Sequence, residues 1–157
     1  MLLTLSVLGV LGIVAFGISL VVRVKRRRSE RVLEQHSITA DELHALLASD
    51  PDLLLFDVRQ PLDLLAYPEV IPKAQRVAPS EVLANPTLIP NDKESIVYCT
   101  CPSDKTSRMV LHRALSLGFS RIKFLQGGLA AWKAKGYPVV PYKGVFHLNP
   151  SFVPRSQ

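Results

Sequence analysis

The hydrophobic positions of this 157-residue chain follow two different patterns. Residues 2–22 form one apolar stretch without a charge, whereas from residue 38 onward short apolar runs alternate with stretches of helical periodicity. Short, continuously apolar runs are typical of strands that are buried on both faces of a parallel sheet. They predict strands over residues 53–58, 75–78, 96–99 and 121–125.

Helix signals lie between these predicted strands. Thr39 and Glu42 have the spacing of a capping box, and Gly118 stands where a helix should end. Strands that alternate with helices indicate an α/β sandwich with a mainly parallel central sheet flanked by helices. In such sheets the functional site lies beyond the carboxyl ends of the strands. The expected helices cover residues 39–47, 62–65, 80–84, 107–117 and 128–135.

The apolar stretch at residues 2–22 has the length of a membrane span, since a helix rises about 1.5 Å per residue and the hydrocarbon core is about 30 Å thick. It lacks the preceding positive charge and the cleavage site of a signal peptide. Six basic residues follow it closely. They are Arg23, Lys25, Arg26, Arg27, Arg28 and Arg31. By the positive-inside rule, we expect a single-pass anchor with the N-terminus outside and the rest of the chain in the cytoplasm.

The net charge of +6 is concentrated directly after this stretch. Residues 23–31 carry six basic residues and one acid, which accounts for +5 and leaves +1 for residues 32–157. We therefore interpret the basic run as a topology signal, with membrane lipid as the partner of residues 2–31 and no nucleic-acid partner. The expected organisation is a transmembrane helix over 1–22, a basic juxtamembrane linker over 23–37, one domain over 38–142 and a tail over 143–157.

One predicted strand, loop and helix carry the candidate chemistry. The apolar run ends at Cys99 and Cys101, and a helical pattern begins soon after them. The residues between are small or turn-forming, so that backbone N–H groups can surround an anion at the helix N-terminus. A cysteine there should be rich in thiolate, which is the nucleophilic form. The predicted binding-loop residues are Pro102, Ser103, Asp104, Lys105, Thr106 and Ser107.

Five segments of the chain, in order, resemble the motifs of the rhodanese-like sulfurtransferases. They are Ile38–Leu43, Leu53–Arg59, Glu69–Ala74, the cysteine loop, and Leu125–Trp132 with Gly136–Pro138. The resemblance implies a rhodanese-like fold and a cysteine that receives sulfane sulfur as a persulfide. The donor would be a small sulfur compound such as thiosulfate, the acceptor a thiol or cyanide-like nucleophile, and no metal or organic cofactor is required. Asp57 and Arg59 match the family's pair, which is expected to support the loops by an ion pair.

Two registers compete for the nucleophile. Cys101 precedes Ser107 and Gly118 by the intervals of the family pattern, which favours Cys101. Cys99 is the alternative, because the apolar strand runs directly into it as it does in the family. The strand pattern also allows Cys99 to be a small core residue. We predict that Cys101 carries the sulfur.

The loop departs from the family pattern at two positions. Asp104 stands where the family has glycine, and Thr106 stands where it has arginine. The preceding motif, Glu69–Ala74, also departs from the family pattern. Val70 stands where the family has histidine, and Lys73 stands where the family has the second glycine of this motif. Loss of a guanidinium and gain of a carboxylate weaken the case for a strongly anionic donor, so that thiosulfate is not secured as the donor.

Other functions remain open on the same residues. The main alternative is a non-enzymatic rhodanese-like module that binds a partner or regulates a pathway at the membrane. A phosphatase or arsenate reductase fits poorly, because those loops need arginine six residues after the cysteine, where this chain has Ser107 or Lys105. A metal site on Cys-x-Cys would need histidines distant in sequence. These are His36, His44, His112 and His147.

Overall fold

The computed structural model describes the backbone of residues 2–100 and 103–144, and the side chains in these ranges from residue 16 onward. The chain divides into two compact units, Met1–His36 and Ser37–Gln157. Each unit is considered by itself.

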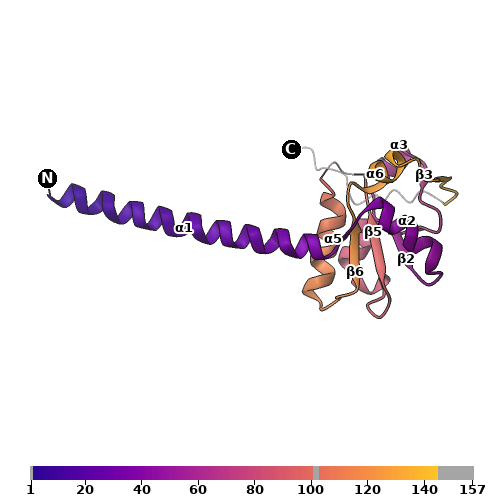
Figure 1. Cartoon of the computed structure of the whole chain (residues 1–157), viewed down its shortest axis with the longest axis horizontal. Helices are drawn as coiled ribbons and strands as arrows, with labels where there is room; N and C mark the ends of the chain where they lie inside the picture. The colour runs from indigo at the N-terminus through magenta and orange to yellow at the C-terminus, as the bar shows by residue number, and fades with distance from the viewer. Residues whose placement is uncertain (1, 101–102, 145–157) are drawn as a thin grey trace, which may run out of the picture. The chain divides into compact units, whose positions relative to one another are not determined.

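The first unit is the helix α1, Leu2–Gln35 (Figure 1). An exposed ion pair between the Arg26 and Glu30 side chains, 3.0 Å from Nε to Oε1, spans one of its turns. Sequence analysis expected a linker over residues 23–37, but the helix continues through Gln35. Residues 23–35 contain neither glycine nor proline, so nothing in them interrupts a helix.

The predicted membrane span at residues 2–22 gains no support from the structure. Among the residues that the structure describes, no helix combines the length and the apolar character that a membrane crossing requires. The side chains of residues 2–15, which form most of the predicted span, lie outside the described residues.

The second unit is built on a five-stranded parallel sheet with the strand order β1-β6-β5-β2-β4 (Figure 1). Its strands are β1 Ser37–Ile38, β2 Leu54–Asp57, β4 Gln75–Arg76, β5 Ser95–Tyr98 and β6 Ile122–Leu125. The central strand β5 is buried along its whole length. This burial explains the continuous apolar run, because neither face of the strand meets water.

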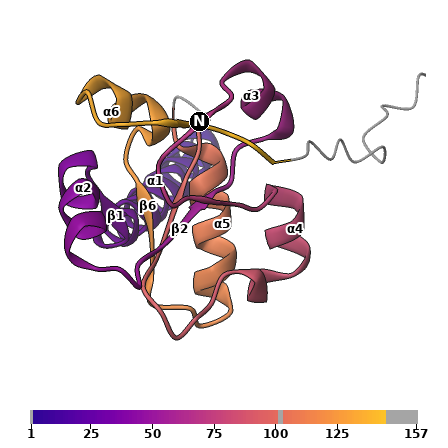
Figure 2. The ribbon, with the colours of Figure 1, turned by 90° about the vertical axis from the view of Figure 1, so that its right-hand side faces the viewer.

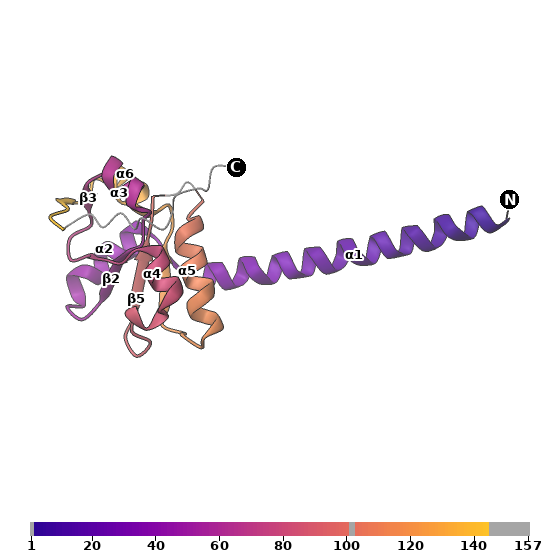
Figure 3. The same ribbon diagram turned by 180° about the vertical axis from the view of Figure 1, so that it is seen from behind.

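Helices cover both faces of the sheet. Figure 2 shows α2 and α6 on one side and α4 and α5 on the other, and Figure 3 shows the view of Figure 1 from behind. The helices are α2 Ala40–Ser49, α3 Pro61–Ala66, α4 Pro79–Ala84, α5 Lys105–Ser116, α6 Gly128–Ala134 and the short 3₁₀ helix η1 Pro86–Leu88. The predicted α/β sandwich with a mainly parallel sheet is confirmed.

Local signals place the helix ends. Thr39 caps α2 and forms the predicted capping box with Glu42, whose carboxylate accepts the Thr39 N–H at 2.8 Å. Gly118 has a φ of 83° just after α5, as the expected helix stop requires. α5 begins two residues earlier than predicted, because Asp104 has a left-handed backbone that turns the chain directly into the helix.

A short antiparallel ribbon was not predicted. β3, Glu69–Val70, pairs with β7, Val140–Pro141, and the Tyr142 N–H donates to the Pro68 carbonyl at 2.7 Å. Strands of two residues are too short to show an alternating pattern. The ribbon ties the end of the described chain to the segment that follows α3.

Candidate functional site

The candidate site lies at the carboxyl ends of the parallel strands β2, β5 and β6. Asp57 at the end of β2 is in register with Tyr98 at the end of β5, and Cys99 follows directly. The Cys99 side chain is fully buried. Cys101 and Pro102, the predicted nucleophile and its neighbour, lie outside the described residues.

The remaining residues of the predicted binding loop divide into two groups. Ser103 and Lys105 are exposed, whereas Asp104, Thr106 and Ser107 are buried at the start of α5. Asp104 has φ 53° and ψ 26° and occupies the N-cap position of this helix. The left-handed region strains most side chains, although aspartate is tolerated there better than most residues.

The turn between β6 and α6 holds both ends of the cysteine loop. The Gly127 N–H donates to Oδ2 of Asp104 at 2.9 Å, and the Leu129 N–H donates to the Cys99 carbonyl at 3.0 Å. A Cβ on Gly128, which has a φ of 52°, would lie 1.9 Å from the Cys99 carbonyl oxygen. Glycine is therefore required where the turn meets the loop. The two successive glycines after a predicted strand are the sequence signal for this close approach.

Polar atoms buried at the start of α5 are incompletely paired. Oδ1 of Asp104, Oγ of Ser107 and Nε of Arg108 are buried without a hydrogen-bond partner among the described residues. Burial raises the pKa of the Asp104 carboxyl, while the Gly127 N–H and the Arg108 guanidinium act to lower it. Sequence analysis did not single out Arg108, whose guanidinium lies over the Phe124 ring at 5.5 Å.

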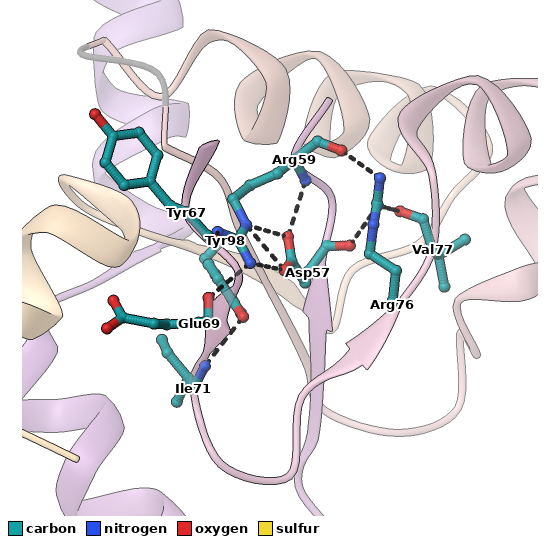
Figure 4. Close-up of polar contacts among 8 residues, drawn as sticks. All are labelled: Asp57, Arg59, Tyr67, Glu69, Ile71, Arg76, Val77 and Tyr98. Carbon is teal, nitrogen blue, oxygen red and sulfur yellow. Dashed lines mark hydrogen bonds and ion pairs between the residues drawn. The ribbon is translucent and has the colours of Figure 1, made fainter. Parts of the chain in front are cut away.

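Asp57 and Arg59 form a buried, bidentate ion pair (Figure 4). The Arg59 Nε donates to both carboxylate oxygens at 2.9 Å, and its Nη2 donates to Oδ2 at 2.5 Å. The other Arg59 N–H groups reach the carbonyls of Tyr67, at 2.8 Å, and Glu69, at 2.9 Å. The guanidinium thus fixes the segment after α3 against the end of β2, which is a supporting role.

Two more residues complete this buried network. Arg76 donates to the carbonyls of Asp57 and Val77 through Nη1 and to that of Arg59 through Nη2, at 2.6 to 2.9 Å (Figure 4). The Ile71 N–H donates to the Tyr98 hydroxyl at 3.2 Å. Burial raises the pKa of this hydroxyl, so Tyr98 stays neutral at physiological pH.

The two positions at which the family pattern has glycine but this chain has another residue adopt a left-handed backbone. Lys73 has a φ of 68° and Asp104 a φ of 53°, and no other non-glycine residue in the described part of the chain has a positive φ. The Lys73 ammonium donates to the Leu47 carbonyl, near the end of α2, at 3.2 Å. Val70, which replaces the histidine, is buried in the β3–β7 ribbon.

Comparison with known proteins identifies the family. The model of the rhodanese-like domain matches residues 39–135, and the chain belongs to this family. This range includes the sheet from β2 to β6, the cysteine loop and all of α6.

Several relatives share this region. A protein of Allochromatium vinosum named sulfurtransferase is 28% identical over 109 residues, which cover 69% of this chain and 98% of the relative. The crystal structure of a rhodanese-related protein from Thermoplasma volcanium is similar at 27% identity with a TM-score of 0.57, and the match covers 67% of this chain and 97% of that one. The Alr3790 protein of Anabaena sp. is similar at 26% identity with a TM-score of 0.58, covering 68% and 83%.

Proposed function

We propose that this protein is a sulfurtransferase that moves a sulfane sulfur from a small donor to a thiol or cyanide-like acceptor through a cysteine persulfide. The observation that carries the proposal is the family match over residues 39–135, which contains the cysteine loop between β5 and α5. The name of the Allochromatium vinosum relative supports the same chemistry.

The reaction consists of two displacements at sulfur. The cysteine thiolate attacks the outer sulfur of the donor, the donor's S–S bond breaks, and sulfite or a thiolate leaves with the electron pair. An acceptor then attacks the outer sulfur of the enzyme persulfide and releases the cysteine thiolate. Backbone N–H groups at the start of α5 stabilise the anionic sulfur in both steps. Thiosulfate is one candidate donor.

We propose Cys101 as the nucleophile. The fully buried Cys99 side chain supports this choice, as does the Cys99 carbonyl, which is held by the Leu129 N–H. Cys99 is thereby fixed in the wall of the domain, whereas a nucleophile must meet a donor. The helix register of Ser107 and Gly118 favours the same cysteine.

Single substitutions test this assignment. The full-length protein in detergent is incubated with thiosulfate or with cysteine persulfide, and mass spectrometry follows the addition of one sulfur. Cys101→Ser should abolish the addition, while Cys99→Ser should leave its rate within about tenfold, about 1.4 kcal/mol of barrier. The reverse pattern would move the nucleophile to Cys99. Loss in both variants would mean that the two thiols act together.

A non-enzymatic binding module is the second candidate. The buried carboxylate of Asp104 and the absence of an arginine at Thr106 favour it, since both weaken anion binding at the loop. If folded wild-type protein accepts sulfur from neither donor, this second function replaces the first.

The cellular location is a separate proposal that rests on the sequence. We propose that residues 2–22 anchor the protein in a membrane and that the basic run to Arg31 keeps the domain in the cytoplasm. A membrane-impermeant thiol reagent should then fail to label Cys101 in intact cells and should label it after permeabilisation. Labelling of intact cells, or recovery of the full chain in the soluble fraction, would contradict this proposal.

A further inference from the structure

We propose that Asp104 determines which sulfur donor the protein accepts, by disfavouring dianionic donors such as thiosulfate and leaving alkyl persulfides as the preferred class. This inference rests on the proposed sulfurtransferase function. It starts from a carboxylate that is more than nine-tenths buried, three residues after the proposed nucleophile, at a position where the family pattern has glycine.

The carboxylate is fixed in position by the turn that follows β6. Oδ2 of Asp104 accepts the Gly127 N–H at 2.9 Å, and the same turn holds the Cys99 carbonyl through the Leu129 N–H at 3.0 Å. The two contacts hold residues on both sides of the cysteine loop against the same turn. The side chain of Asp104 therefore cannot turn out to solvent when a donor approaches without breaking its hydrogen bond.

The negative charge is also incompletely compensated. Oδ1 of Asp104 has no hydrogen-bond partner among the described residues, in contrast to Asp57, whose two oxygens both accept from Arg59. The nearby Arg108 has its guanidinium over the Phe124 ring, between α5 and the sheet. Lys105 is exposed, where water and salt screen its charge. A donor at the start of α5 thus meets the field of a buried anion.

This field distinguishes donors by charge. Thiosulfate brings two negative charges and releases sulfite, whereas a protonated alkyl persulfide brings none at its sulfur atoms. In the second case the thiolate attacks the terminal sulfur, the S–S bond breaks, the alkyl thiolate leaves with the electron pair, and the proton stays on the transferred sulfur. Coulomb repulsion grows with the product of the two charges, so a fixed negative charge at the start of α5 slows the approach of a dianion and affects a donor with uncharged sulfur atoms little.

Asp104→Asn separates the effect of the negative charge from the structural role of the side chain. Asparagine keeps an oxygen that can accept the Gly127 N–H, and it is among the residues that best tolerate a positive φ. Asp92→Asn is the matched control, because it removes the same charge from an exposed side chain that precedes the amino end of β5, at the opposite edge of the sheet. Thermal unfolding of both variants establishes that they fold.

The experiment measures the second-order rate constant of sulfur loading on the full-length protein, with thiosulfate and with cysteine persulfide, by quenching and mass spectrometry. Asp104→Asn should raise the rate with thiosulfate about tenfold and change the rate with cysteine persulfide less than twofold. The gain should shrink as ionic strength rises, and Asp92→Asn should change neither rate.

Three outcomes would overturn the inference. Equal gains with both donors would mean that the substitution changes the loop rather than its selectivity, and an unchanged thiosulfate rate would mean that the charge does not reach the donor. If the folded wild-type protein is loaded by neither donor, the sulfurtransferase proposal itself fails. That result differs from a wild type that is loaded but shows no selectivity at Asp104.

Discussion

The turns at Lys73 and Asp104 both have a left-handed backbone, but they lie in different environments. Lys73 is exposed, and its ammonium donates to the Leu47 carbonyl, where the carboxyl end of a helix favours a cation. Asp104 is buried, and one carboxylate oxygen accepts the Gly127 N–H while the other has no partner in the described structure. Each side chain forms a hydrogen bond that the glycine of the family pattern could not form. Only the second brings a buried charge to the cysteine loop.

The comparison teaches that this chain has a left-handed backbone at two positions where the family pattern has glycine, and that the two side chains differ in burial. Lys73 stands in a surface turn, whereas Asp104 stands in the cysteine loop of the candidate site. Four experiments, two of them with a second variant for comparison, would break or sharpen this difference, and the expected effects decrease in the order given.

Gly128→Ala should be the most damaging, because it acts on the turn that holds Asp104 and Cys99. Its Cβ would meet the Cys99 carbonyl oxygen at 1.9 Å at a φ of 52°. We expect a loss of about 3 kcal/mol or more in the free energy of unfolding, measured by urea denaturation. Gly136→Ala is the control, since its φ is 73° but nothing lies within 4 Å of the added Cβ. It should cost only about 1–2 kcal/mol, and equal losses would show that the close approach is not required.

Asp104→Ala should destabilise the domain by about 1–2 kcal/mol, because it leaves the Gly127 N–H without its acceptor. Lys73→Ala removes an exposed contact at a similar φ and should cost less than about 1 kcal/mol. Urea denaturation of the two variants under one condition measures the difference. A larger loss at Lys73 would reverse the proposed ranking of the two turns.

Asp104→Asn should change how stability depends on pH. Burial raises the pKa of the Asp104 carboxyl in the folded state, so the folded protein binds a proton more readily than the unfolded chain. Wild-type stability therefore gains from this group as the pH falls through that raised pKa toward the ordinary value of 3.8, and the asparagine variant lacks the gain. The variant should be more stable at neutral pH by at most about 1 kcal/mol, and the gap should close on acidification. A gap independent of pH would exclude a titrating carboxylate as its cause.

Lys73→Gly should have the smallest effect. Glycine relieves the strain of the left-handed backbone, but it loses the contact with the Leu47 carbonyl and gains conformational entropy in the unfolded chain. These contributions nearly cancel, and we expect a change within about 0.5 kcal/mol by thermal or urea unfolding. A change above about 1 kcal/mol in either direction would show that this surface turn contributes more than its contacts suggest.

The features that could be predicted from the sequence are those that residues close together in the chain determine. The capping box of Thr39 and Glu42 and the buried strand at Ser95–Tyr98 could be read from spacing and apolar runs. The destination of the Asp104 carboxylate could not, because Gly127 is distant in sequence and meets it only through the folding of β6 beside β5. The β3–β7 ribbon was missed because two residues carry no period.

The candidate site shows the same distinction between local and distant contacts. The Asp57–Arg59 ion pair involves residues two positions apart, so a local motif could suggest it. The carbonyls that Arg59 reaches at Tyr67 and Glu69 depend on the path of the chain after α3. The choice of Cys101 over Cys99 stays a prediction.

The pairing of β1 with β6 has a consequence for how the protein is made. Ile38 is in register with Leu125. The first strand, β1, can therefore pair with β6 only after most of the domain has been synthesised. The Gly127–Leu129 turn, which fastens the cysteine loop, also emerges well after the two cysteines. Contacts between distant parts of a chain require the closure of a long loop, which slows folding. The two cysteines are therefore synthesised before the residues that hold Asp104 and the Cys99 carbonyl in place.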